Sequence, residues 1–193
     1  MKNSSIIFKI FLAFSIFLAG QLLISSASYC DSDVGNYTYV LTGSKLSSGF
    51  DMGLNTSNEK TNWLINEDGF MSMSYPSGQS WGAVFITVGK PKDPPRPYKN
   101  FSAFNTLTVE MKGAHGGEQL EIGIKSNEQP DDGSEKKIQV QLTSEWQPFS
   151  FPLNKFNGVD LNKVYVPIEF VFSGPKEQKV YFRNVKYENI HAK

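Results

Sequence analysis

Two stretches of alternating apolar and polar residues near the C-terminus constrain the fold more than any other feature of the chain. Segments 164–173 and 180–187 each alternate with period two, and the polar turn 173–177 separates them. Such alternation places successive side chains on opposite faces of a β-sheet. The apolar phase shifts by one residue at Arg183-Asn184, which predicts a β-bulge. We therefore expect one dry face against a core and one outer face with rings and charges, namely Tyr165, Glu169, Tyr181 and Arg183.

Shorter segments of the same kind fill the rest of the chain. Residues 90–97 include four prolines and cannot form a central strand, and residues 54–62 and 127–135 are typical of polar loops. Many short strands with Gly- and Pro-rich turns predict an all-β fold, an antiparallel β-sandwich (jelly roll), as a single domain over residues 29–193. The further predicted strands cover residues 37–42, 63–65, 70–75, 81–88, 106–112, 120–125, 138–142 and 146–153.

The first 28 residues have the composition of a secretory signal peptide. Lys2 and Lys9 lie beside an apolar run over residues 10–24, and the small residues 25–28 form the predicted cleavage region. Polar residues interrupt this run, which falls short of the roughly 20 apolar residues of a membrane span. We therefore predict a secreted protein, whether extracellular, periplasmic or at the cell surface. An uncleaved membrane anchor is the alternative.

Cys30 and the charge balance narrow the class of protein. Cys30 is the only cysteine, so the domain has no internal disulfide. A lipidated Cys30 is a further alternative, although Tyr29 stands where a lipoprotein signal has a small residue. Cleavage of residues 1–28 removes two lysines and no acid, which changes 19 basic and 19 acidic residues to 17 and 19. The lack of a basic surplus argues against a nucleic-acid binder, because such binders rely on phosphate contacts.

The sequence contains few candidates for catalysis. His115 lies in a glycine-rich turn and His191 lies near the C-terminus, and neither accompanies a nucleophile motif. No paired cysteines or clustered histidines could hold zinc. Glu110, Glu121 and Glu169 occupy outward strand positions, so a small glycoside hydrolase, with two carboxyls about 5–10 Å apart, is an alternative. The closely spaced acids of jelly-roll glucanases, Glu-x-Asp-x-x-Glu, are absent from the sequence.

Aromatic residues at outward strand positions indicate a sugar-binding surface instead. The apolar face of a pyranose stacks on a flat aromatic ring, while its hydroxyls bind acids, amides and guanidinium groups. Trp81, Tyr165 and Tyr181 share outward faces with such polar residues. Gly123 lacks a side chain at mid-strand, so we expect a ligand to approach the backbone there.

Three segments resemble carbohydrate-binding modules with the galactose-binding-like jelly-roll fold. Ser48–Gly53 and Val180–Val185 look like the opening and closing strands of such modules, and Gly117–Lys125 looks like one of their sheet strands. The resemblance spans most of residues 37–190. It implies a domain that binds polysaccharide on a concave sheet or at loop tips and performs no chemistry itself.

The resemblance also implies that a structural calcium ion could be bound, because many such modules hold one between their first and last strands. Their opening motif has Glu where Asp51 stands, and their closing motif has Asp where Arg183 or Asn184 stands. Asp51 keeps the negative charge, whereas an arginine beside a calcium ion would repel it. Asp51 is therefore the candidate metal ligand that the resemblance implies. The carboxylates of the polar loop 127–135 are a second candidate for calcium, although this loop lacks the ordered ligand spacing of known calcium loops.

These observations predict a secreted, non-catalytic domain whose partner is a polysaccharide or another glycan, bound on the concave face of the sandwich. The alternative is a structural or protein-interaction domain of the cell surface, which would present the same sheet to a protein partner. Either Tyr165 or Tyr181 is the predicted stacking platform. The other predicted ligand-binding residues are Trp81, Glu121, Lys125, Gln139, Gln141, Glu169 and Arg183.

Overall fold

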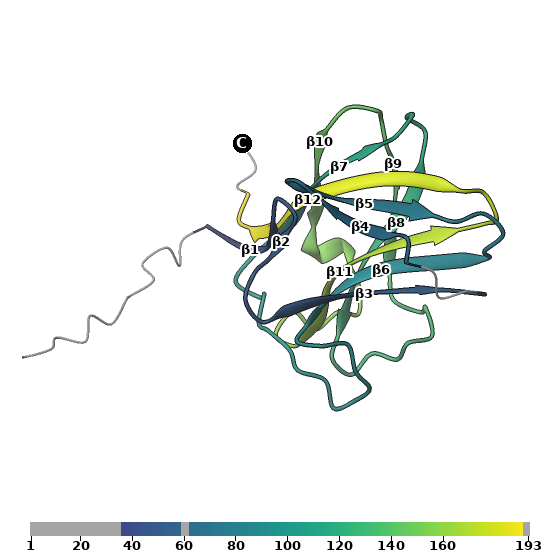
Figure 1. Ribbon diagram of the computed structural model, residues 1–193. Coiled ribbons are helices and arrows are strands. Elements are labelled where there is room, and N and C mark those ends of the chain that lie inside the picture. Colours follow the sequence, from purple (N-terminus) through teal and green to yellow (C-terminus); the bar gives the residue numbers. More distant parts are fainter. Residues whose placement is uncertain (1–35, 59–61, 191–193) are drawn as a thin grey trace, which may run out of the picture. The chain divides into compact units, whose positions relative to one another are not determined.

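The structure, a computed structural model, describes residues 36–58 and 62–190. The predicted signal peptide and Cys30 lie outside the described residues. The described chain forms two antiparallel sheets, which confirms the prediction of an all-β antiparallel sandwich (Figure 1). A single turn of 3-10 helix, Leu153–Lys155, is the only helical element among the described residues.

One sheet has five strands in the order β3-β6-β11-β8-β9. Figure 1 shows β3, β6 and β11 side by side in this sheet. Every neighbouring pair in it is antiparallel. The strand bounds are β3 Phe50–Thr56, β6 Trp81–Val88, β8 Gln119–Ser126, β9 Lys137–Gln141 and β11 Val164–Ser173.

The other sheet has seven strands, and β12 is its centre. One edge of β12 pairs with β7, while its other edge pairs first with β5 and then with β1. The short strands β2 and β4 and the strand β10 complete the sheet. The strand bounds are β1 Tyr37–Thr42, β2 Lys45–Leu46, β4 Leu64–Glu67, β5 Phe70–Tyr75, β7 Thr106–Gly113, β10 Gln147–Pro152 and β12 Gln178–Glu188.

The predicted β-bulge in β12 is confirmed. The register of β12 against β7 shifts between Arg183 and Lys186. Asn184 has a φ of 53°, a left-handed conformation that asparagine adopts more readily than most residues. Its side-chain oxygen accepts a hydrogen bond from the Gly43 N–H at 2.8 Å. The bulge lets β12 change partners from β5 to β1 along the same edge.

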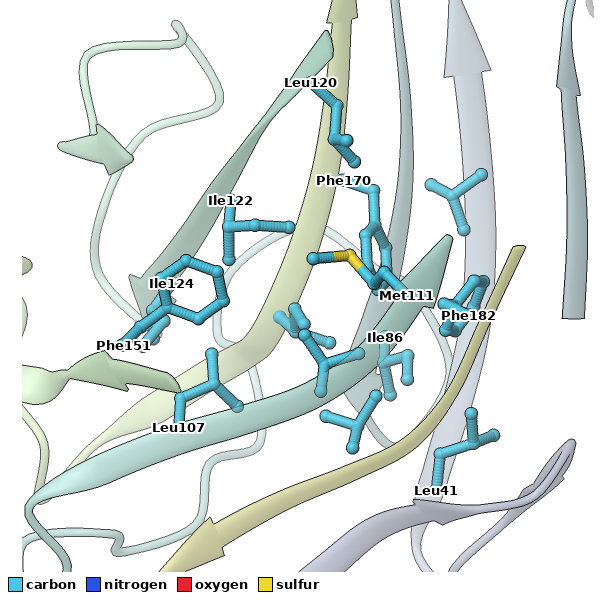
Figure 2. Close-up of a cluster of buried hydrophobic side chains, with 14 of the residues drawn as sticks. Leu41, Ile86, Leu107, Met111, Leu120, Ile122, Ile124, Phe151, Phe170 and Phe182 are labelled. Atoms are coloured by element: carbon cyan, nitrogen blue, oxygen red, sulfur yellow. The ribbon is translucent and has the colours of Figure 1, made fainter. Parts of the chain in front are cut away.

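The expectation that segments 164–173 and 180–187 share one outer face is wrong. β11 lies in the five-stranded sheet and β12 lies in the seven-stranded sheet, so the turn between them crosses from one sheet to the other. Their apolar faces meet in the interior, where the ring centroids of Phe170 and Phe182 are 4.3 Å apart (Figure 2). The polar faces of β11 and β12 therefore point away from each other, on opposite sides of the sandwich.

Aromatic side chains fill much of the space between the sheets. The Tyr75 ring stacks on Phe172 with centroids 5.1 Å apart, and Trp63 meets both rings edge-on. The buried Tyr187 hydroxyl donates a hydrogen bond to the Pro167 carbonyl of the other sheet at 2.7 Å. This hydrogen bond satisfies a polar group that would otherwise cost free energy in the core.

The polar segment after residue 53 forms part of a strand, so the prediction of a loop over 54–62 is wrong in its first part. β3 pairs with β6 from Phe50 opposite Val88 to Thr56 opposite Gly82. Met52 and Leu54 pack against the core from this edge strand, while Asn55 is exposed. An edge strand needs only one apolar face, and two apolar residues were too few to be recognised as a strand pattern.

Replacing Phe182 with alanine should lower the free energy of unfolding by about 3–5 kcal/mol, because a large cavity would remain between the sheets. Urea unfolding followed by tryptophan fluorescence measures this loss. Gln147→Ala, at an exposed position of β10, is the matched control and should change stability by less than about 0.5 kcal/mol. Equal losses for the two variants would contradict the central position of Phe182.

Candidate functional site

Seven of the nine predicted ligand-binding residues lie on the outer face of the five-stranded sheet. β6 contributes Trp81, β11 contributes Tyr165 and Glu169, β8 contributes Glu121 and Lys125, and β9 contributes Gln139 and Gln141. The inward faces of the same strands carry core residues such as Val84, Phe170, Ile122 and Val140. The sheet register, rather than proximity in sequence, brings these seven residues to one surface.

The half of this face nearest the start of β6 is open to solvent. Trp81 is 44% exposed and stands opposite Ser173 of β11. Gln139 and Gln141 are exposed on β9, and Glu121, which pairs with Gln139, is half-buried. The open half therefore combines a large accessible indole with amide and carboxylate groups.

Phe85 adds a second ring to this face, and the sequence analysis missed it. Phe85 is half-buried and lies two positions along β6 from Ala83 and four from Trp81. Its ring lies over Gly53 of the paired strand β3, where a Cβ atom would be only 2.5 Å from the Phe85 Cε2 atom. A glycine opposite a phenylalanine on a polar edge strand was the signal that could have identified Phe85.

The other half of the face is covered by two loops, residues 89–105 and 127–136. The Tyr165 hydroxyl accepts a hydrogen bond from the Lys92 N–H at 2.9 Å, and the Arg96 guanidinium lies 5.0 Å above the centre of the Tyr165 ring. Arg96 also forms an ion pair with Asp131 and donates to the Gln129 carbonyl of the second loop at 2.9 Å. Tyr165 is therefore only 4% exposed, so its ring supports a wall of the site.

A network of charges, most of them buried, fixes these loops to the sheet. The Lys125 ammonium lies 2.9 Å from the Asp131 carboxylate and 3.4 Å from that of Glu135. Lys137 forms a further ion pair with Glu135. Burial opposes the charge on Lys125, but the hydrogen bond to Asp131 and the nearby carboxylates raise its pKa. Lys125 therefore stays charged and ties one loop to β8.

Glu169 and Glu135 form a carboxyl pair within this network. Burial, the negative charge of Glu135 and the hydrogen bond to Glu135 raise the pKa of Glu169 to about 8. Burial also opposes ionisation of Glu135, but hydrogen bonds from Lys137 and Glu169 lower its pKa to about 2. At neutral pH the two carboxyls share one proton, which Glu169 carries and donates to Glu135.

The expectation that a ligand approaches the backbone at Gly123 is wrong. The Glu169 side chain lies over Gly123, where a Cβ atom would be 2.2 Å from the Glu169 Oε1 atom. Gly123 is opposite Glu169 in the sheet register, so the glycine provides the space that the buried carboxyl occupies. The absence of a side chain at Gly123 therefore makes room for the buried charge network. The surface that a ligand can reach lies nearer to Trp81.

A cavity of about 840 Å³ adjoins the open half of the face at one end of the domain. The turns over residues 113–117 and 173–178 supply most of its lining. Ser173 and Gln119 belong to both the cavity and the sheet, where Ser173 pairs with Trp81 and Gln119 pairs with Gln141. A chain that crosses the open half past Trp81 therefore reaches this polar cavity.

Tyr181 and Arg183 are not part of this surface, because they lie on the outer face of the seven-stranded sheet. The Arg183 Nε atom donates to the Glu110 carboxylate at 2.8 Å, and the Asn184 amide donates to the same group at 2.8 Å. Burial opposes the charge on Glu110, but these two hydrogen bonds lower its pKa. Of the three glutamates considered for catalysis, Glu110 is thus on the opposite sheet and Glu169 is bound to Glu135.

The residues proposed for calcium do not fit the ion. Asp51 lies on β3 of the five-stranded sheet, and its carboxylate accepts the Met52 N–H at 2.8 Å. Arg183 and Asn184 lie on β12 of the other sheet and bind Glu110. Across residues 36–58 and 62–190, no three His, Cys, Asp or Glu side chains gather as a metal site would require.

Comparisons with solved structures place this fold among carbohydrate-binding modules. The chain is similar to the family 30 module of the cellulosomal cellulase Cel9D-Cel44B of Clostridium thermocellum, with a TM-score of 0.58 and 18% identity over 81% of this chain and 99% of that one. It is also similar to the family 11 module from Clostridium thermocellum, with a TM-score of 0.54 and 14% identity over 82% of this chain and 98% of that one. The D83A mutant of the module CBM29-2 aligns with a TM-score of 0.55 and 16% identity, over 80% and 93% of the two chains. These likenesses establish the fold.

The family model described as carbohydrate binding domain 30 matches residues 29–189. The chain therefore belongs to this family and is a non-catalytic carbohydrate-binding domain. A search of curated protein sequences finds no match to the chain. Within the described part of the chain, no helix has the length and apolar character to cross a bilayer.

The carboxyl pair predicts how stability depends on pH. The folded protein holds a proton at Glu169 that the unfolded chain releases above the ordinary pKa of 4.5, so the free energy of unfolding should fall as the pH rises from about 5 to about 8. Glu169→Gln removes this titration and should flatten the fall. Urea midpoints at intervals across this range measure both slopes.

The control for this experiment is Glu121→Gln, an outward carboxyl on β8 that belongs to no ion pair among the described residues. Glu121→Gln should keep the wild-type slope. Identical slopes for wild type and Glu169→Gln between pH 5 and 8 would contradict a shared proton at Glu169.

Proposed function

We propose that the open half of the outer face of the five-stranded sheet binds a neutral polysaccharide chain. The observation that carries this proposal is a pair of accessible rings on one strand, Trp81 and Phe85. Four residues of an extended strand separate them by about 13 Å, so they can stack on different sugar rings of one chain. Glu121 lies two strands away on β8, and Gln139 and Gln141 lie on the next strand, β9, so across the same face they supply acceptors and donors for sugar hydroxyls.

The covered half of the face limits the binding surface at one end and so sets the direction in which a sugar chain would lie. The two loops anchored by Tyr165, Lys125 and Asp131 form a wall at one end. The cavity beyond Trp81 leaves the other end accessible. A sugar chain would therefore run from the Glu169 region towards Trp81. Glu169, which is only 6% exposed, would contribute to the rigid floor more than to direct contacts.

Ligands bound by similar modules suggest the class of polysaccharide. CBM29-2 mutants form complexes with mannohexaose and with cellulohexaose, and the family 11 module forms a complex with a β-1,3-1,4-mixed-linked tetrasaccharide. Two rings separated along one strand suit such extended, unbranched chains. We therefore take β-linked hexose polymers as the substrate class for this domain.

Export from the cell completes the proposal. The sequence features of residues 1–28 support cleavage near residue 28, and the similar family 30 module belongs to a cellulosomal cellulase. The intact mass of the exported protein tests this. A mature chain that begins near residue 29 supports it, and a chain with residues 1–28 retained contradicts it.

Trp81→Ala should weaken binding to β-linked glucan or mannan at least about tenfold, which corresponds to about 1.4 kcal/mol, because the exposed indole loses its stacking contact. Phe85→Ala should weaken binding in the same direction. Retention of purified residues 29–193 on a panel of immobilised polysaccharides, followed by titration calorimetry, measures the effect. A chelator should leave retention unchanged.

Two tryptophan controls separate binding from folding. Trp63 is 4% exposed, so Trp63→Ala should lower stability by about 3–5 kcal/mol. Trp146 lies beside the seven-stranded sheet, so Trp146→Ala should leave neutral glycan binding unchanged. A Trp81→Ala variant that loses stability but binds normally would return Trp81 to a structural role. Wild type that binds no polysaccharide would favour a protein partner for the same face.

A further inference from the structure

The outer face of the seven-stranded sheet carries a second group of rings that the proposed glycan site does not use. Phe70 comes from β5, Tyr181 from β12, and Trp146 from the residue that precedes β10. The Phe70 ring centroid lies 5.8 Å from that of Trp146 and 5.6 Å from that of Tyr181, both edge-on. All three side chains are half-buried, so each keeps part of its ring accessible. Side chains from three separate segments thus build one aromatic surface.

Three cations lie against these rings. The Lys112 ammonium is 5.4 Å from the Trp146 ring centroid and 5.2 Å from that of Tyr181. The Arg183 guanidinium lies 4.4 Å from the Trp146 ring, and the Lys179 ammonium lies 5.6 Å from the Tyr181 ring. These distances are within the range of cation–π attraction. We call these six residues, Phe70, Lys112, Trp146, Lys179, Tyr181 and Arg183, the aromatic–cation patch.

Two of the three cations have no carboxylate partner. Glu110 is already bound by Arg183 and Asn184, so its negative charge is committed within the sheet. Among the described residues, Lys112 and Lys179 lie within 4.0 Å of no carboxylate. The exposed Glu67 and Glu145, at the margins, form no ion pair with the patch. A half-buried ammonium held between two rings is therefore free to bind an anion.

A buried hydroxyl beneath the patch also lacks a partner. Ser72 of β5 pairs with Tyr181 in the sheet register, and Ser72 is 1% exposed. Its hydroxyl makes no hydrogen bond within the described protein. Buried hydroxyls usually find a partner, so the rings of the patch cover a polar group that is left unsatisfied within the described protein.

We propose that the aromatic–cation patch is a second binding surface, which takes an acidic polysaccharide built from uronate sugars. A uronate ring carries an apolar face and a carboxylate in the same unit. The patch offers the complement, because each cation lies within 6 Å of a ring that can stack on a sugar. Lys112 is already ordered between two rings, so less side-chain entropy is lost when a ligand binds.

The patch is separate from the proposed neutral-glycan site. β11 and β12 pack with their apolar sides together, so the outer faces of their sheets point in opposite directions. A neutral chain and an acidic chain can therefore bind at the same time, and one domain can link two kinds of polysaccharide. Because ion pairing contributes to only one site, salt should weaken acidic binding and spare neutral binding.

The test compares retention on polygalacturonate with retention on a neutral β-glucan for wild type and four variants. Lys112→Gln and Trp146→Ala should each weaken polygalacturonate binding at least about fivefold, or about 1 kcal/mol, and leave β-glucan binding unchanged. Lys112→Arg, which keeps the charge, should retain most of the polygalacturonate binding. Trp81→Ala, on the opposite face, should keep polygalacturonate binding. Raising the salt to about 0.5 M should weaken the acidic interaction alone.

Several outcomes would overturn this proposal. Wild type that is not retained on polygalacturonate at low salt would do so, as would Lys112→Gln with undiminished retention. Binding of polyglutamate as tightly as polygalacturonate would assign the patch to an acidic protein partner instead. Thermal midpoints of the variants should stay close to wild type, and Tyr181→Phe provides a second, milder probe of the same ring surface. Loss of β-glucan binding alone would count against the neutral site and leave this surface in place.

Discussion

The apolar faces of β11 and β12 pack against each other in the interior, and most other strands take their positions from one of these two. β11 pairs with β6 and β8 along its two edges, while β12 pairs with β7 along one edge and with β5 and β1 along the other. The contact between Phe170 and Phe182 and the hydrogen bond from Tyr187 to the Pro167 carbonyl join the two sheets. Because the apolar sides of both sheets are buried in the core, each sheet has only one outer face. The two outer faces can therefore carry different side chains and bind different ligands.

The outer face of the five-stranded sheet shows how buried polar groups shape a binding surface. Burying carboxyls and ammonium groups is costly unless they are paired, and here Lys125, Glu135 and Asp131 form a paired set with Glu169 protonated. The set holds two loops over Tyr165 and leaves the region around Trp81 open. Such a network stabilises one arrangement of the loops, so that a flat ligand meets a surface already in its binding shape. This preorganisation reduces the entropy lost on binding.

The strands could be predicted from the sequence because period-two alternation is a local property. β6, for example, has the predicted bounds of residues 81–88. The assignment of β11 and β12 to different sheets could not be predicted, since a short polar turn can close a hairpin or cross between sheets. Seven of the nine predicted residues share one face because outward parity within a strand is also local. Phe85 and Glu135 were missed, because an outward phenylalanine resembles core and a loop glutamate gives no pattern.

The most direct test of the central claim is a map of where a neutral oligosaccharide contacts the domain. Backbone amide signals in nuclear magnetic resonance, followed during titration with cellulohexaose and mannohexaose, provide this map. The account predicts that the largest shifts fall on β6, β11 and β8 of the five-stranded sheet, at Ala83, Phe85, Val171 and Glu121. Shifts confined to β5, β7 and β12 of the seven-stranded sheet would contradict it.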